Sequence, residues 1–393
     1  MDKLAFRLLW LLVFSIPAEN MLVLPGIGTI SRFVGILVAA AVMLLLCKKQ
    51  RIRRIGPVQI LFVFFFIWIT ATFYWSRDLV SSRDAIKLFA QQGVFVWIVW
   101  EIAVSEERQI QLLKAYVLGA LIPIINIAMA FFQGAQSSYF RYSAAGFDPN
   151  DIGLTIALGV PIAWYLGTLV KGNWMSWLFR LYVPLATIAI ILTASRSAFI
   201  ALMVAMLFVV ASFTRLSLFN KCALFLLVLV SSLLTIKYIP SYSWARLMTI
   251  GSQVSAGDLG SRMNIWRSGL KAFFHDPFFG SGIGTFSFSV EPFLGVPMSP
   301  HNLFLSIMVD LGIVGLLLFI AIVLAALYGL KDMPVVKRRL WIFIFATWLV
   351  GVMTLGWAHR KPTWFFISLV AAQGAVYLKQ DEEIQSVADT PKA

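Results

Sequence analysis

Uninterrupted apolar runs, each long enough to cross a lipid bilayer, recur along the chain. Two examples are "VQILFVFFFIWITATFYW" (58–75) and "LGIVGLLLFIAIVLAALY" (311–328). These runs are continuous rather than alternating, and in lipid only helices and closed barrels satisfy every backbone group, so they predict transmembrane helices. With 60% of its 393 residues hydrophobic and 13% charged, the chain has too much apolar surface for one soluble core. We therefore predict an all-α polytopic membrane protein.

Charged breaks and breaks rich in proline or glycine divide the sequence into about twelve predicted membrane spans. They lie near residues 8–24, 30–47, 57–75, 85–104, 110–132, 152–170, 176–193, 197–213, 222–239, 302–328, 340–358 and 363–378. All of them belong to a single predicted transmembrane domain, residues 1–393. The longest segment between spans, 240–301, is predicted to contain short helices.

The distribution of basic residues predicts the orientation in the membrane. The loop "KKQRIRR" (48–54) is the strongest cytoplasmic marker. Counting spans from this loop places both termini in the cytoplasm and four segments on the opposite, periplasmic face: 76–84, 133–151, 240–301 and 359–362. Long ordered loops are usually functional, so we expect the active site to include 240–301.

Several kinds of function are disfavoured by the sequence. The net charge of +14 would indicate nucleic-acid binding in a soluble protein, but here the basic residues collect in short loops, so we expect no nucleic-acid partner. Cys47 and Cys222 have no histidine nearby for thiol catalysis. His275, His301 and His359 lack the short spacing and cysteine partners of a zinc site. We expect neither a metal nor another cofactor.

A set of outward-facing cations is the most informative polar feature. It consists of Arg196 in "TASRSA", Arg262 and Arg267 in "SRMNIWRS", His301 in "SPHN", and Arg360. Arg267 and Arg360 have an alternative explanation as residues that snorkel to the lipid headgroups. Arg196 lies between two apolar runs, where an unpaired charge is costly, so a bound anion or a paired partner is expected. A planar guanidinium binds two phosphate oxygens at once, which suits a diphosphate held without a divalent ion.

Three sequence motifs, in this order, resemble a known family. They are "TASRSAFIAL" (193–202), "RMNIWRSGLKAFFHDPFFGSGIGTF" (262–286) and "PHNLFLSIMVDLGIVGLL" (300–317), with a weaker echo in "GFDPNDIG" (146–153). As a set they resemble the O-antigen ligase and polysaccharide polymerase superfamily of bacterial inner membranes. The resemblance covers a region of about 189–317, which includes the long loop.

The resemblance implies a GT-C-like, metal-independent glycosyltransferase acting at the periplasmic face. Its donor would be a glycan on undecaprenyl diphosphate, with membrane lipids around it. Its acceptor would be the lipid A core (a ligase), a second lipid-linked glycan (a polymerase) or, less favoured by the short loop, a protein hydroxyl. Arg196 and Arg262 would hold the diphosphate and stabilise its developing charge. His301 would take the proton of the acceptor hydroxyl. Asp310, ~13 Å farther along the helix, is expected to pair with a buried cation instead.

Other residues are expected to bind substrate. The expected set is Arg267, Trp266, Asn302, Arg360, Asp148 and Asn150. Trp266 could offer a sugar-stacking face or simply pack the loop helix onto the bundle, and packing is the commoner role of such an aromatic. Asp148 and Asn150 would line the acceptor side.

A transporter or flippase for lipid-linked oligosaccharides is the alternative from another class. It would also have about twelve spans and a few intramembrane charges. Transporters, however, tend to have two matching halves with ionisable residues near the midplane, whereas here the unusual polar residues cluster toward one face. That asymmetry favours an enzyme.

Overall fold

A computed structural model describes residues 1–21, 23–24, 26, 28–137, 140–169, 174–213, 218, 221, 237, 240–251 and 262–388. This part of the chain is almost entirely helical, which confirms the all-α prediction. The helices are α1 (Asp2–Ser15), α2 (Ile30–Lys49), α3 (Pro57–Ala71), α4 (Leu79–Ile102), α5 (Glu106–Phe132), α6 (Pro149–Leu169), α7 (Trp174–Leu192), α8 (Arg196–Phe213), α10 (Ser241–Met248), α12 (Arg262–His275), α13 (Phe286–Leu294), α14 (Leu303–Tyr328), α15 (Val335–Val352) and α16 (Lys361–Ala388). A small hairpin pairs β1 (Val23–Leu24) with β2 (Gly28–Thr29).

Seven stretches in the described part of the chain are long and apolar enough to cross a membrane. They are α2, α3 with the turn that follows it, α4, α5, α6, α7, and α14 with the turn that follows it. Each corresponds to one of the twelve predicted spans, which supports the polytopic membrane assignment. α8 is apolar but shorter. The predicted span 222–239 lies, apart from Lys237, outside the described residues.

The first predicted span, 8–24, is wrong in its bounds. Helix α1 begins at Asp2 and ends at Ser15, and a short 3-10 turn containing Pro17 follows it. Proline lacks the N–H that would continue the helix, and Glu19, which lies beyond it, is charged. At 14 residues α1 is about 21 Å long, shorter than the hydrocarbon core.

Helix α6 is the centre of the bundle, and nearly all of its residues are buried. It packs against α5, α7, α8 and α15. Gly153, near the start of α6, allows a close approach to α8, because a Cβ there would lie 2.5 Å from the Cβ of Ala198. This contact brings "GFDPNDIG" beside "TASRSA".

Helix α14 is broken at Gly312, where φ is 67°. The "GSGIGTF" segment docks into the break: Ser281 and Gly282 donate their backbone N–H groups to the carbonyls of Val309 and Asp310, at 2.9 Å each. Nonhelical backbone at membrane depth must be satisfied by protein in this way. The glycine-rich turn therefore does more than reverse the chain, because it anchors the long loop to a membrane helix.

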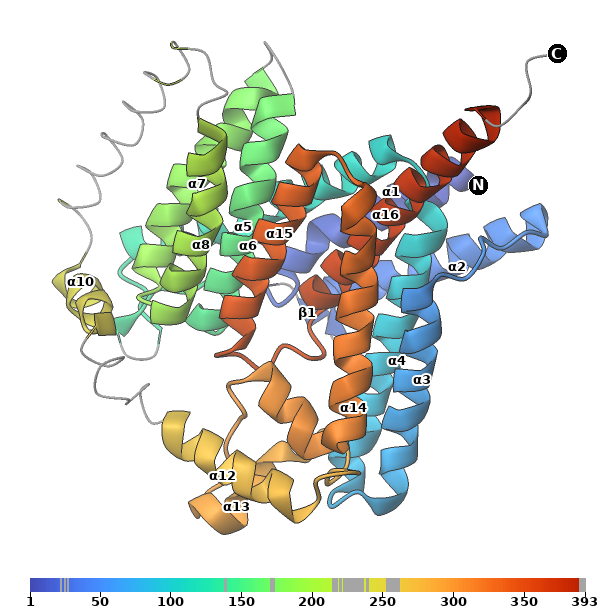
Figure 1. Ribbon diagram of the computed structural model, residues 1–393. Helices are drawn as coiled ribbons and strands as arrows, with labels where there is room; N and C mark the ends of the chain where they lie inside the picture. Colours follow the sequence, from blue (N-terminus) through green and yellow to red (C-terminus); the bar gives the residue numbers. More distant parts are fainter. Residues whose placement is uncertain are drawn as a thin grey trace.

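The loop helices lie far from the chain ends. In Figure 1, α12 and α13 are at the bottom of the molecule, while the start of α1 and the end of α16 lie at the upper right. α12 packs on α13 and α14, around a small apolar cluster that includes Ile265, Phe286 and Leu305. The predicted loop segment 240–301 therefore contains short helices in its described part, as expected.

Candidate functional site

The candidate site is a cavity of about 490 Å³ where α4, α6, α13, α14 and the α15–α16 loop meet. Its polar lining residues are Asp148, Asp151, Ser287, Ser299, His301, Ser306, Asp310, His359 and Arg360. Three of these residues, Asp148, His301 and Arg360, belong to the predicted site. Distant parts of the sequence are thus combined in one pocket, as a small-molecule site requires.

The "TASRSA" motif forms the turn between α7 and α8. α7 ends at Leu192, and Ala194 takes a left-handed conformation with φ of 47° that redirects the chain. Ser195 then caps α8 by accepting the backbone N–H of Ala198 at 3.3 Å. Arg196 is the first residue of α8, so the start of this helix fixes the position of its backbone.

A buried arginine that the sequence analysis did not select holds this turn in place. Arg141 is 4% exposed, and its Nε donates to the carbonyl of Thr193 at 2.8 Å. Its Nη2 donates to Oδ1 of Asn150 at 2.9 Å, and the same oxygen accepts the hydroxyl of Ser195 at 2.7 Å. Asn150 therefore connects "GFDPNDIG" with "TASRSA", and its side-chain carbonyl oxygen already accepts two hydrogen bonds from the protein. Its predicted role in lining the acceptor side remains a prediction.

Four arginines converge at this end of the bundle: Arg141, Arg196, Arg246 and Arg262. Burial lowers the pKa of Arg141 to about 10, and the charges of Arg246 and Arg262 contribute to that shift. Burial, together with the charge of Arg196, likewise lowers the pKa of Arg262. Arg196 donates to the hydroxyl of Thr249 at 3.3 Å. Among the described residues, the buried Nε of Arg246 has no hydrogen-bond acceptor.

His301 lines the cavity and is close enough to Arg262, a member of the arginine cluster, to be affected by its charge. Its φ of 45° is in the left-handed region, which is uncommon outside glycine, and the next residue, Asn302, is the N-cap of α14. Burial lowers its pKa from 6.5, and Arg262 adds to the effect, while Asp148 and Asp151 oppose it. Asn302 caps α14 by accepting the N–H of Leu305 at 3.0 Å, so the side-chain oxygen of this predicted substrate contact is committed to the helix.

The charge of Arg360 is paired within the protein. Its Nη2 donates to Oδ2 of Asp151 at 2.5 Å, and the indole of Trp357 donates to Oδ1 of the same carboxylate at 3.0 Å. The next residue, Lys361, is ion-paired with buried Glu19. Arg360 also lines the cavity, so its role in binding substrate remains a prediction, and the ion pair fixes its guanidinium beside Asp151 at the cavity wall.

The expectation that Asp310 pairs with a buried cation is wrong. Asp310 is 4% exposed, and one carboxylate oxygen accepts the N–H of Gly284 at 3.1 Å. The other oxygen has no hydrogen-bond partner among the described residues, and no ion pair to Asp310 occurs there. The docked glycine-rich turn supplies an amide where a cation was expected. Asp310 also lines the same cavity as His301.

The two remaining predicted residues lie on α12. Trp266 packs against the apolar cluster between α12, α13 and α14, and its buried indole N–H has no partner among the described residues. Packing is thus the role that the contacts support. Arg267 is exposed and outside the cavity lining. The described residues contain no group of three or more histidine, cysteine, aspartate or glutamate side chains placed to hold a metal ion.

Comparison with known proteins agrees with the motifs. Residues 181–320 match the family model described as O-Antigen ligase. This range contains Arg196, Arg262, His301 and Asp310, together with the broken helix α14. The match confirms the resemblance to the O-antigen ligase superfamily and supports a role in surface polysaccharide synthesis. No curated protein matches the chain.

Proposed function

Because the chain carries an O-antigen ligase region at residues 181–320, we propose that it is a glycosyltransferase of the bacterial inner membrane. It transfers a glycan from undecaprenyl diphosphate to an acceptor hydroxyl at the periplasmic face, as an O-antigen ligase or a polysaccharide polymerase. The observation that carries this proposal is that His301 lines an acidic cavity and lies within electrostatic reach of Arg262, one of four clustered arginines. A donor anion and an acceptor sugar need those two environments side by side.

The arginine cluster suits the diphosphate. Four guanidinium groups held close together repel one another, and burial removes part of their hydration. An anion of two or more charges relieves this repulsion, and each planar guanidinium can bind two of its oxygens. The same charges stabilise the diphosphate as it leaves, when its negative charge increases.

The cavity suits a sugar acceptor. It offers carboxylate and hydroxyl groups, among them Asp148, Ser287 and Ser306, that can bind several hydroxyls at once. The acceptor oxygen attacks the anomeric carbon as the bond from that carbon to the diphosphate oxygen breaks, and the diphosphate leaves with the electron pair. The acceptor proton passes to a ring nitrogen of His301. A lowered pKa keeps this imidazole neutral at neutral pH, which is the form that accepts a proton.

A purified-protein assay tests this reaction. Full-length protein in lipid nanodiscs, with chelator present, is supplied with a polyprenyl-diphosphate-linked glycan and an acceptor lipid, and product is followed by mass spectrometry. We expect transfer by the wild type and loss of transfer in His301→Ala. His275→Ala is the matched control, because His275 is exposed on α12 and outside the cavity. Equal transfer by His301→Ala and the wild type would remove the proposed base.

The cellular phenotype separates the two acceptor classes and the alternative class of function. In a deletion strain, free polymer that is no longer attached to lipid A core indicates a ligase, whereas single attached repeats indicate a polymerase. Accumulation of the lipid-linked donor on the cytoplasmic face would instead indicate a flippase. Complementation with His301→Ala should fail in the first two cases and succeed in the third.

A further inference from the structure

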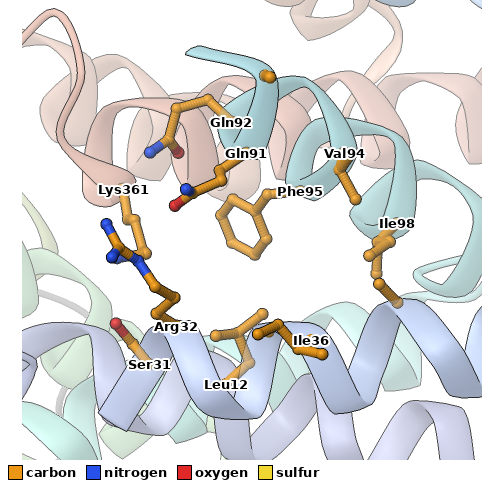
Figure 2. Close-up of a pocket in the computed structure, with 13 residues that line it drawn as sticks. Leu12, Ser31, Arg32, Ile36, Gln91, Gln92, Val94, Phe95, Ile98 and Lys361 are labelled. Carbon is orange, nitrogen blue, oxygen red and sulfur yellow. The ribbon is translucent and has the colours of Figure 1, made fainter. Parts of the chain in front are cut away.

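A second cavity lies on the other side of α4 from the candidate active site. It has a volume of about 340 Å³ and is bounded by α1, α2, α4 and the first residue of α16. Figure 2 shows its side chains: Arg32, Gln91, Gln92 and Lys361 gather at one end, and Leu12, Ile36, Val94, Phe95 and Ile98 line the other. We call this cavity the α2–α4 groove. Its lining is divided into a polar end and an apolar end.

The polar end carries one uncompensated positive charge. Lys361 is paired with buried Glu19, which also accepts the hydroxyl of Ser31 at 2.8 Å. Arg32 has no ion pair or hydrogen bond with the described residues, and its Nη1 lies 3.0 Å from where a Cβ on Gly28 would be. The net charge of the polar end is therefore close to +1, from Arg32.

A buried, unpartnered acceptor lies beside this charge. Gln92 is 2% exposed, and its amide nitrogen donates to the carbonyl of His359 at 3.0 Å. Its amide oxygen is buried and has no donor among the described residues. Gln91, one residue earlier on α4, also lines the groove. A ligand with a hydroxyl or amine near its charged group would satisfy the free oxygen of Gln92.

The apolar end matches a hydrocarbon chain. From Arg32 to Ala39 the groove follows two turns of α2, ~10 Å, between apolar side chains. Gly35 leaves the wall open there, because a Cβ on it would meet only Leu12, at 4.0 Å. The neighbouring face of α2 exposes Leu37, as expected for a surface that faces lipid.

We propose that the α2–α4 groove binds an anionic membrane phospholipid. Its phosphodiester pairs with Arg32, a headgroup hydroxyl donates to Gln92, and one acyl chain lies along α2 between Leu12 and Phe95. A phosphodiester carries one negative charge, which equals the charge of the polar end, whereas a diphosphate would be only partly neutralised there. Basic pockets between membrane helices are a known mode of phospholipid recognition.

The site adjoins the candidate active site through one residue. Gln92 contacts the backbone of His359, and His359 lines the catalytic cavity. A lipid bound at Gln92 therefore supports the α15–α16 loop from outside the cavity. This inference does not depend on the proposed reaction, because lipid binding is measured directly.

Native mass spectrometry of the full-length protein tests the proposal. The detergent-purified protein is titrated with phosphatidylglycerol or with zwitterionic phosphatidylethanolamine. We expect one tight phosphatidylglycerol site and at least tenfold weaker binding of phosphatidylethanolamine. Arg32→Gln should weaken phosphatidylglycerol binding about tenfold or more, the loss expected for one charge-assisted contact. Arg83→Gln is its control, because Arg83 is an exposed cation on α4 outside the groove lining.

A second variant tests the acyl-chain position without changing a charge. Gly35→Leu fills the groove and also favours the helix, so the protein should fold and lose the tight site. Ala40→Leu, on the exposed face of α2 outside the groove lining, should keep it. Wild-type affinity in both Arg32→Gln and Gly35→Leu would overturn the proposal. Tighter binding of a polyprenyl monophosphate than of phosphatidylglycerol would overturn the choice of lipid.

Discussion

Asp151 and Arg360, which are 209 residues apart in the sequence, form an ion pair of 2.5 Å at the wall of the candidate-site cavity. The pair joins the first turn of α6 to the loop before α16. Trp357 holds the second carboxylate oxygen, so Asp151 is fixed from two directions. The ion pair and the indole hydrogen bond together fix this part of the cavity wall.

Asp151→Asn should destabilise the α15–α16 loop. The change removes the carboxylate charge and leaves the partly buried guanidinium of Arg360 without its counter-ion, a cost of about 1–3 kcal/mol. We expect a lower melting temperature, and a smaller further loss when Arg360→Gln is added. A double-mutant cycle by thermal unfolding measures the coupling, and purely additive effects would contradict the pairing.

The acid side of the pH–rate profile should report His301. Burial and the charge of Arg262 lower its pKa from 6.5, so the imidazole stays neutral through neutral pH and becomes protonated only in more acidic solution. Transfer should therefore be constant near pH 7 and fall with a midpoint below 6.5 as the pH decreases. Initial rates measured at ~0.5 pH intervals between about pH 4.5 and 8 test this prediction. An acidic midpoint above 6.5, or one shifted in His275→Ala, would exclude His301 as the base.

Arg196→Lys and Arg262→Lys should each lower the transfer rate. Lysine keeps the charge but cannot bind two phosphate oxygens in one plane, so we expect a ~10- to 1000-fold loss, the range for removing one stabilising donor. Arg83→Lys, on an exposed surface of α4, should retain full activity. Steady-state rates in nanodiscs provide the measurement, and two silent variants would mean that the cluster does not bind the leaving group.

Gly280→Ala should destabilise the protein through two separate effects. A Cβ at Gly280 would lie 2.5 Å from the backbone nitrogen of Gly312, and its φ of 70° is unfavourable for alanine. Gly295→Ala is the matched control, because its φ of 84° carries the same penalty with open space around it. We expect ~1 kcal/mol from the backbone in both and a larger loss only in Gly280→Ala. Equal melting temperatures would show that the docked turn yields without cost.

The orientation in the membrane is testable with single cysteines. In a background without native cysteines, Leu270→Cys on exposed α12 should react with a membrane-impermeant maleimide added to intact spheroplasts. Arg51→Cys, in the basic loop, should react only after permeabilisation. Reaction of both, or of Arg51→Cys alone, would reverse the periplasmic placement of the site.

The sequence alone determined the helical class, most of the helix positions and the family, because these depend on local patterns. Apolar runs of membrane length indicate spans wherever they pack, and "TASRSA" lies between two such runs. The same reasoning selected Arg196, Arg262 and His301 as candidate site residues, because their motifs are short and contiguous. It failed at the first span, where the break at Pro17 outweighed the apolar run.

Only the tertiary structure decided which of the polar residues act together. Nothing in "YFRYS" marks Arg141, which becomes part of the site because Thr193 and Asn150 fold against it. The sequence shows no partner for the charge of Arg360, and the fold places Asp151 beside it. Asp310 was expected to form an ion pair, but in the fold its carboxylate accepts the backbone N–H of Gly284. In each case the partner is distant in the sequence. The sequence therefore shows the charge of each residue, but not which group forms a hydrogen bond or ion pair with it.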